Sequence, residues 1–164
     1  MKKTKLYFAY GSNMLEDRLK DRVPSAVVKI TGSISGHILK FNKVSTDKLK
    51  NQSGKGNIER TGNKEDVVHG VVFKFNDAEK PALDDAEGLD KGYAEKTVTV
   101  STPEGEVEIV TYYATNTNNS LKPYDWYMVH VIKGAIEHNL PKDYIKRLEA
   151  VETIEDPNPE LHDT

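Results

Sequence analysis

The chain has 164 residues, of which 37% are hydrophobic and 30% are charged, and its formal net charge is -3. This length suits one domain with a hydrophobic core. The small net charge does not predict nucleic acid or an anionic membrane as a partner, and no apolar run approaches the roughly 20 residues that are needed to span a membrane. The absence of cysteine excludes disulfides, thiolate zinc sites and cysteine nucleophiles, and without a recognisable signal segment we expect a cytoplasmic protein.

In chain order, the first predicted elements are a strand over residues 5–10 and a short amphipathic helix over residues 14–22. A strand pattern follows over residues 34–44. The polar stretch of residues 48–64 is the longest candidate loop, with a short strand expected at residues 57–60. Its glycines match neither a phosphate-binding loop nor a dinucleotide-binding motif, which favours an ordinary surface loop.

The second half of the chain is predicted to hold three strands and three helices. The strands cover residues 66–75, 93–101 and 106–115, and the helices cover residues 80–87, 123–138 and 142–151. Because helices follow the strands instead of alternating with them, we expect an α+β domain on a curved or closed sheet. This domain is predicted to span residues 1–152, and residues 153–164 are predicted to form an acidic tail.

The loop after the first strand, Tyr10-Gly11-Ser12-Asn13, permits two interpretations. In the first, Ser12 or Asn13 caps the helix that follows, as these residue types commonly do. In the second, the amides of the loop stay available for an anion or a developing oxyanion, with the positive end of the helix behind them. A nucleophilic role for Ser12 is disfavoured, because the G-x-S-x-G pattern is absent and no histidine can be assigned as its base.

Histidines give no indication of a metal site, because none lies four residues from another and no His-Glu-x-x-His motif occurs. The five histidines are His37, His69, His130, His138 and His162.

Glu87 is the second candidate for chemistry. A helix over residues 80–87 places Leu83 and Glu87 on one face, so an inward Leu83 draws Glu87 towards the interior while Asp84 and Asp85 point to solvent. Burial and the negative end of the helix both raise a carboxylate pKa, which suits a general acid/base. A surface glutamate at a helix end is the alternative.

Two stretches resemble the gamma-glutamylcyclotransferase family: YFAYGSNM at residues 7–14, and LDDAEG at residues 83–88, in which the family has its catalytic glutamate. The similarity runs from about residue 6 to residue 151. Further similar stretches are HGVVF at 69–73, KGA at 133–135 and NLP at 139–141.

The resemblance implies a mixed β-barrel flanked by helices, without metal or cofactor. It implies that the free α-amino group of a small-molecule γ-glutamyl substrate attacks its own γ-carbonyl, which releases 5-oxoproline and an amine or amino acid. Glu87 is then the catalytic acid/base. The substrate-binding residues carried over from the family are Tyr7, Phe8, Ala9, Tyr10, Gly11, Ser12, Asn13 and Tyr127. Family members are often homodimers, although the sequence itself indicates no oligomeric state.

Three questions stay open at this stage. The leaving group could be an amino acid, an amine or part of a protected biosynthetic intermediate, and a non-catalytic binding domain of the same fold is a further alternative. The side chain of Tyr93 could face the site or the opposite side of its strand, because a shift of one residue reverses the face. The loop amides could bind the α-carboxylate or the γ-carbonyl.

Overall fold

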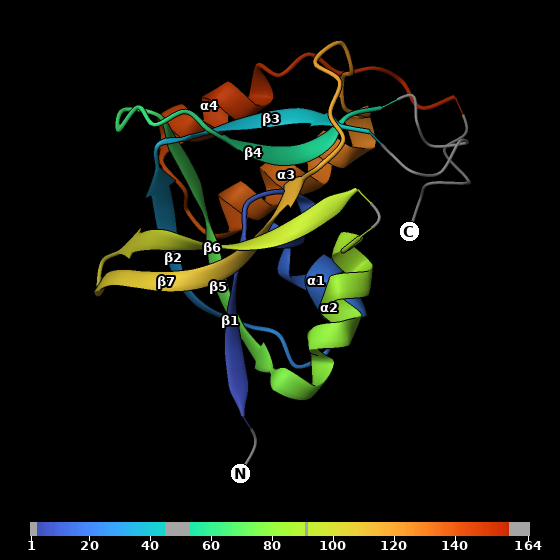
Figure 1. The fold of residues 1–164 in the computed structure, drawn as a ribbon. Coiled ribbons are helices and arrows are strands. Elements are labelled where there is room, and N and C mark those ends of the chain that lie inside the picture. Colours follow the sequence, from blue (N-terminus) through green and yellow to red (C-terminus); the bar gives the residue numbers. More distant parts are fainter. Residues whose placement is uncertain (1–2, 45–52, 91, 158–164) are drawn as a thin grey trace.

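Five strands close into a barrel in the computed structural model, which describes residues 3–44, 53–90 and 92–157 (Figure 1). The barrel strands are β1 (Thr4–Ala9), β2 (Val27–Ser35), β5 (Val67–Asn76), β6 (Tyr93–Thr102) and β7 (Gly105–Ala114). Neighbours run antiparallel, except that β1 and β7 pair in parallel and close the order β1-β5-β2-β6-β7. The predicted α+β fold, a mixed β-barrel flanked by helices, is confirmed.

A separate antiparallel sheet is formed by β3 (His37–Lys43) and β4 (Lys55–Arg60). The single strand predicted over residues 34–44 is wrong, because the chain turns at Gly36 and divides β2 from β3 there. Gly36 has a φ of 71°, a left-handed conformation that favours glycine. The short strand expected in the polar loop is present and begins at Lys55, whereas residues 45–52 lie outside the described part of the chain.

Four α-helices and two short 3₁₀ turns complete the fold of the described residues. They are η1 (Ser12–Met14), α1 (Glu16–Arg22), η2 (Asp77–Glu79), α2 (Lys80–Glu87), α3 (Asp125–Glu137) and α4 (Lys142–Glu149). Figure 1 shows α1 and α2 side by side, and α3 packs against η1 and α4. The predicted bounds of α2 are confirmed, with a proline in its first turn and Gly88 as its left-handed C-cap at a φ of 78°.

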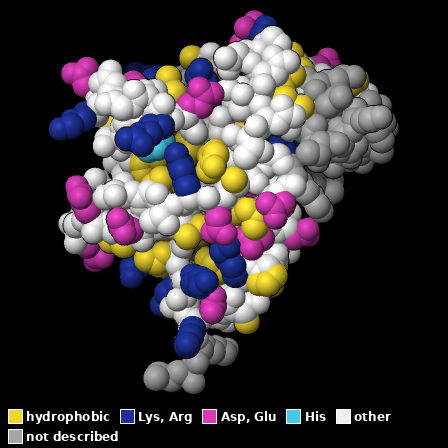
Figure 2. All heavy atoms as spheres, in the orientation of Figure 1, with side chains coloured by type: hydrophobic (Ala, Val, Ile, Leu, Met, Phe, Trp, Pro, Cys, Tyr) yellow, Lys and Arg dark blue, Asp and Glu magenta, His cyan; other side chains and the backbone are white. Residues whose placement is uncertain are grey.

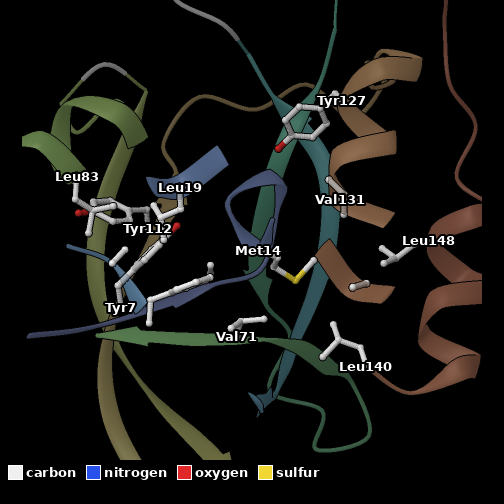
Figure 3. Packing of buried hydrophobic residues seen from close by; sticks show 14 of the residues in the cluster. Tyr7, Met14, Leu19, Val71, Leu83, Tyr112, Tyr127, Val131, Leu140 and Leu148 are labelled. Atoms are coloured by element: carbon white, nitrogen blue, oxygen red, sulfur yellow. The ribbon is translucent and has the colours of Figure 1, made fainter. Parts of the chain in front are cut away.

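Two hydrophobic clusters divide the side chains of β1 between them. Tyr7 and Ala9 belong to the larger cluster, which joins the barrel to the helices, whereas Phe8 belongs to a smaller cluster of barrel residues. This division follows the alternation of side chains along a strand. In Figure 3, Met14 of the larger cluster lies between Val71 of the barrel and helix α3. The end of β1 is therefore fixed by packing on both of its faces.

The surface and the C-terminal segment add two observations. Figure 2 shows acidic and basic side chains interspersed over one face, in keeping with the small net charge. Within the described residues, no helix is both long and apolar enough to cross a membrane. Past α4, Ile154 pairs with Tyr124 and Asp156 accepts a hydrogen bond from Trp126 Nε1 at 2.8 Å, while residues 158–164 of the expected tail lie outside the described residues. The predicted domain boundary stays a prediction.

Candidate functional site

A pocket opens where β1 ends, and most of the predicted site residues meet there. Those that line it are Tyr7, Tyr10, Gly11, Ser12, Asn13, Glu87 and Tyr127. Phe8 and Ala9 are not among the residues that line the pocket, and their expected contact with substrate stays a prediction. Both are fully buried in the hydrophobic clusters, where alternation along β1 and the close packing beneath it place them.

Glu87 enters the pocket from the last turn of α2. Leu83, one turn earlier on the same face, is 1% exposed and anchors the helix, as its spacing predicts. The Tyr7 hydroxyl and Asn13 Nδ2 both donate to Glu87 Oε1, Asn13 at 2.7 Å. Both bonds end on one oxygen, so the other, Oε2, carries neither of the hydrogen bonds that hold the side chain.

The pKa of Glu87 is raised above its usual range because burial penalises the charged form. Hydrogen bonds from Tyr7 and Asn13 and the positive charges of Arg22 and Arg18 oppose this effect without cancelling it. A carboxyl group in this environment can accept and return a proton nearer to neutral pH than an exposed one.

The loop before η1 does not use its polar side chains as helix caps, so the capping interpretation is wrong. Neither η1 nor α1 has a side-chain cap, and the Asn13 amide instead contacts Glu87. Within the described residues, the N–H groups of Ser12 and Asn13 donate to no protein acceptor. The sequence leads one to expect the positive end of the helix directly behind these amides. It is not there, because α1 begins only at Glu16.

Two tyrosines enclose a glycine at the opposite wall of the pocket. Tyr127 projects from α3 (Figure 3), and its hydroxyl accepts a hydrogen bond from Gly56 N at 2.9 Å. Tyr93 donates its hydroxyl to Gly56 O at 2.6 Å, which settles the open question of its side. A Cβ at Gly56 would lie 3.0 Å from the Tyr127 hydroxyl, so only glycine leaves this wall open. The interpretation of this glycine as part of an ordinary surface loop is wrong.

Tyr112 also lines the pocket, and no sequence signal singles it out. Its carbonyl accepts the Tyr10 hydroxyl at 2.7 Å, and its own hydroxyl donates to Asp84 Oδ1 at 2.6 Å. Asp84 forms an ion pair with Lys80 at 2.6 Å. The expectation that Asp84 points to solvent is therefore wrong, because it binds both a cation and a wall tyrosine. Burial and Asp84 raise the pKa of Tyr112, which stays protonated as a donor.

The pocket offers donors for a polar organic ligand and few groups for a metal. Among the residues that the structure describes, no histidine lines the pocket, and none there can serve as a base for Ser12. In the described ranges, no group of three or more histidine, aspartate or glutamate side chains could hold a metal ion.

Comparisons with known proteins agree with this geometry. The model of the AIG2-like family matches residues 67–148, which include Glu87. Gamma-glutamylcyclotransferase of Bos taurus is 37% identical over 149 residues, which cover 90% of this chain and 78% of the relative, and the Mus musculus protein is 35% identical over 154 residues, which cover 93% and 81%. The chain belongs to the gamma-glutamylcyclotransferase family. A solved structure named gamma-glutamyl cyclotransferase superposes with a TM-score of 0.84 at 33% identity, over 93% of this chain and 90% of that one.

In this member of the gamma-glutamylcyclotransferase family, the two stretches that carry the resemblance meet in space. Asn13 of the first stretch contacts Glu87 of the second, although 74 residues separate them in the chain. The pairing of the two family stretches across one pocket is the central feature of the site.

Proposed function

We propose that this protein is a gamma-glutamylcyclotransferase, which cyclises the γ-glutamyl group of a γ-glutamyl amino acid or peptide to 5-oxoproline and releases the remainder. The observation that carries the proposal is the half-buried Glu87 carboxyl, held at the pocket by Tyr7 and Asn13. Its support is a chain that is 37% identical to a relative named for this activity. The cytoplasmic location and the homodimer expected above stay predictions.

Glu87 transfers one proton in the proposed reaction. The substrate's neutral α-amino nitrogen attacks its own γ-carbonyl carbon, and the ring C–N bond forms. Glu87 accepts the proton that this nitrogen loses and returns it to the nitrogen of the amide C–N bond that breaks. The raised pKa of Glu87 supports both roles, because a group whose pKa is nearer to the working pH can both accept and donate a proton.

The rest of the pocket holds the substrate in a folded conformation. Ring closure is intramolecular, so a large part of the barrier falls when the amine is kept near the carbonyl. The N–H groups of Ser12 and Asn13 suit the α-carboxylate or the oxyanion that develops on the γ-carbonyl. We assign substrate contacts to Tyr10, Gly11 and Tyr127 from the same pocket.

Turnover of γ-glutamyl-alanine, with 5-oxoproline measured by mass spectrometry, tests this function. Glu87→Gln keeps the size and the acceptor oxygen of the side chain but cannot take the proton, so the rate should fall by at least about a hundredfold. Asp85→Asn removes an exposed carboxylate from the same helix and serves as the matched control with unchanged rate. Full activity in Glu87→Gln would refute the mechanism, and substrate binding by the wild type without turnover would favour the non-catalytic alternative.

A further inference from the structure

A lysine side chain that is almost fully covered lies beside the pocket without being part of the machinery described so far. Lys43 is the last residue of β3, and only 5% of it is exposed. Its Nζ lies 4.8 Å from the centre of the Tyr93 ring. Tyr93 lines the pocket and donates its hydroxyl to Gly56 there. One aromatic side chain therefore contacts the Lys43 charge with its ring and the pocket wall with its hydroxyl.

Lys43 has no counter-ion within residues 3–44, 53–90 and 92–157, and its ammonium makes no hydrogen bond there. The neighbouring side chain of Asn42, in contrast, has several hydrogen-bond partners. Asn42, equally buried, donates to Glu59 at 2.7 Å and to Asn119 at 2.8 Å, and accepts from Asn57 at 3.1 Å. A buried cation is costly unless an anion or several acceptors face it, and a ring contact compensates only in part. Burial lowers the pKa of Lys43, because it disfavours the charged form of the side chain.

The missing partner is not Glu87. That carboxyl receives its hydrogen bonds from Tyr7 and Asn13, and the cations that lower its pKa are Arg22 and Arg18. The reacting end of the pocket is thus complete without Lys43. Lys43 adjoins the pocket wall that Tyr93 and Gly56 form, and this wall belongs to other strands than the reacting end of the pocket. An anion that reached this wall would neutralise the charge of Lys43.

We propose that Lys43 binds the carboxylate of the leaving amino acid and thereby determines the selectivity between γ-glutamyl amino acids and γ-glutamyl amines. The inference rests on the proposed function. A γ-glutamyl amino acid carries two carboxylates. The α-carboxylate is attached to the carbon that bears the attacking amine, and so must stay near Glu87 and the loop amides. The second carboxylate belongs to the leaving group, which extends away from Glu87, and it is the anion free to reach Lys43.

A matched pair of substrates tests this assignment. γ-Glutamyl-alanine and γ-glutamyl-ethylamide differ only in the carboxylate of the leaving group. Lys43→Met keeps an apolar side chain of similar length, and loss of one charge-assisted contact should lower kcat/KM for γ-glutamyl-alanine by about ten- to a hundredfold. The value for γ-glutamyl-ethylamide should stay unchanged. Lys74→Met, which removes an exposed lysine from β5, is the control and should change neither value.

The outcomes separate the inference from the proposed function. If Lys43→Met lowers kcat/KM equally for both substrates, or for neither, the assignment of Lys43 is overturned while turnover by the wild type still supports the function. If the wild type releases 5-oxoproline from neither compound, the proposed function fails and the inference fails with it. Lys43→Gln, which is polar and uncharged, should show the same selective loss if the methionine variant does not fold.

Discussion

The Glu87 carboxyl experiences opposing influences on its pKa, and single residues decide the balance. Burial raises the pKa, whereas donation from Tyr7 and Asn13 to Oε1 lowers it. A fully desolvated carboxyl would stay protonated and could not act as a base, and a fully solvated one would be a poor acid. The two donors therefore allow the carboxyl group to act both as a base and as an acid.

Tyr7→Phe removes one of these donors. The Tyr7 hydrogen bond stabilises the carboxylate form, so its loss should raise the pKa of Glu87 further and move the acidic limb of the kcat/KM–pH profile to higher pH. The measurement is the pH dependence of kcat/KM for the wild type and for Tyr7→Phe, and the expected result is an acidic limb at higher pH in the variant.

The profile of Tyr10→Phe is the control for this shift. The Tyr10 hydroxyl donates to the Tyr112 carbonyl and not to Glu87, so this variant should leave the acidic limb in place even if its rate is lower. An acidic limb in Tyr7→Phe that stays in place or moves to lower pH would contradict the role assigned to Tyr7.

Elements differ in how far local sequence determines them. Helix α2 could be predicted in full, because a proline in its first turn, Gly88 after its end and the spacing of Leu83 and Glu87 are all local signals. The break at Gly36 could not, because an alternating pattern continues across it. Tyr112 and Gly56 reach the pocket through pairing and packing between distant segments, and one residue of register would turn Tyr112 away.

Gly54, which precedes β4, and Gly56, the second residue of β4, should separate stability from activity. A Cβ at Gly56 would lie 3.0 Å from the Tyr127 hydroxyl, at the end of a side chain, so Gly56→Ala should keep the melting temperature while misplaced substrate lowers kcat/KM on the order of ten- to a hundredfold. A Cβ at Gly54 would lie 1.9 Å from the backbone oxygen of Phe41, so Gly54→Ala should lower the free energy of unfolding by about 1–3 kcal/mol.

Thermal unfolding and steady-state kinetics on both variants check this contrast. A Gly56→Ala protein with wild-type kcat/KM would show that the Gly56 wall does not contact substrate. A Gly54→Ala protein as stable as the wild type would show that β4 can move away from β3.

At the scale of the whole molecule, the pocket depends on contact between the two ends of the chain. Met14, which follows the loop that lines the pocket, is fully buried against α3. His138 Nε2 lies 2.8 Å from the Met14 carbonyl oxygen, 124 residues away in the chain. The position of Ser12 and Asn13 is therefore set by helix α3 as much as by β1.

Gly134 of α3 is the point of closest contact, and Gly134→Ala tests this dependence. Alanine within a helix normally stabilises by about 1 kcal/mol relative to glycine. Here its Cβ would lie 2.7 Å from Leu15 N and 2.8 Å from Met14 Cβ, so we expect a loss of about 1–3 kcal/mol in urea unfolding and a lower kcat/KM as η1 is displaced. Ile136→Ala, at a position of α3 that is 54% exposed, is the control and should change neither quantity. A Gly134→Ala protein with increased stability and full activity would show that the loop holds its position without α3.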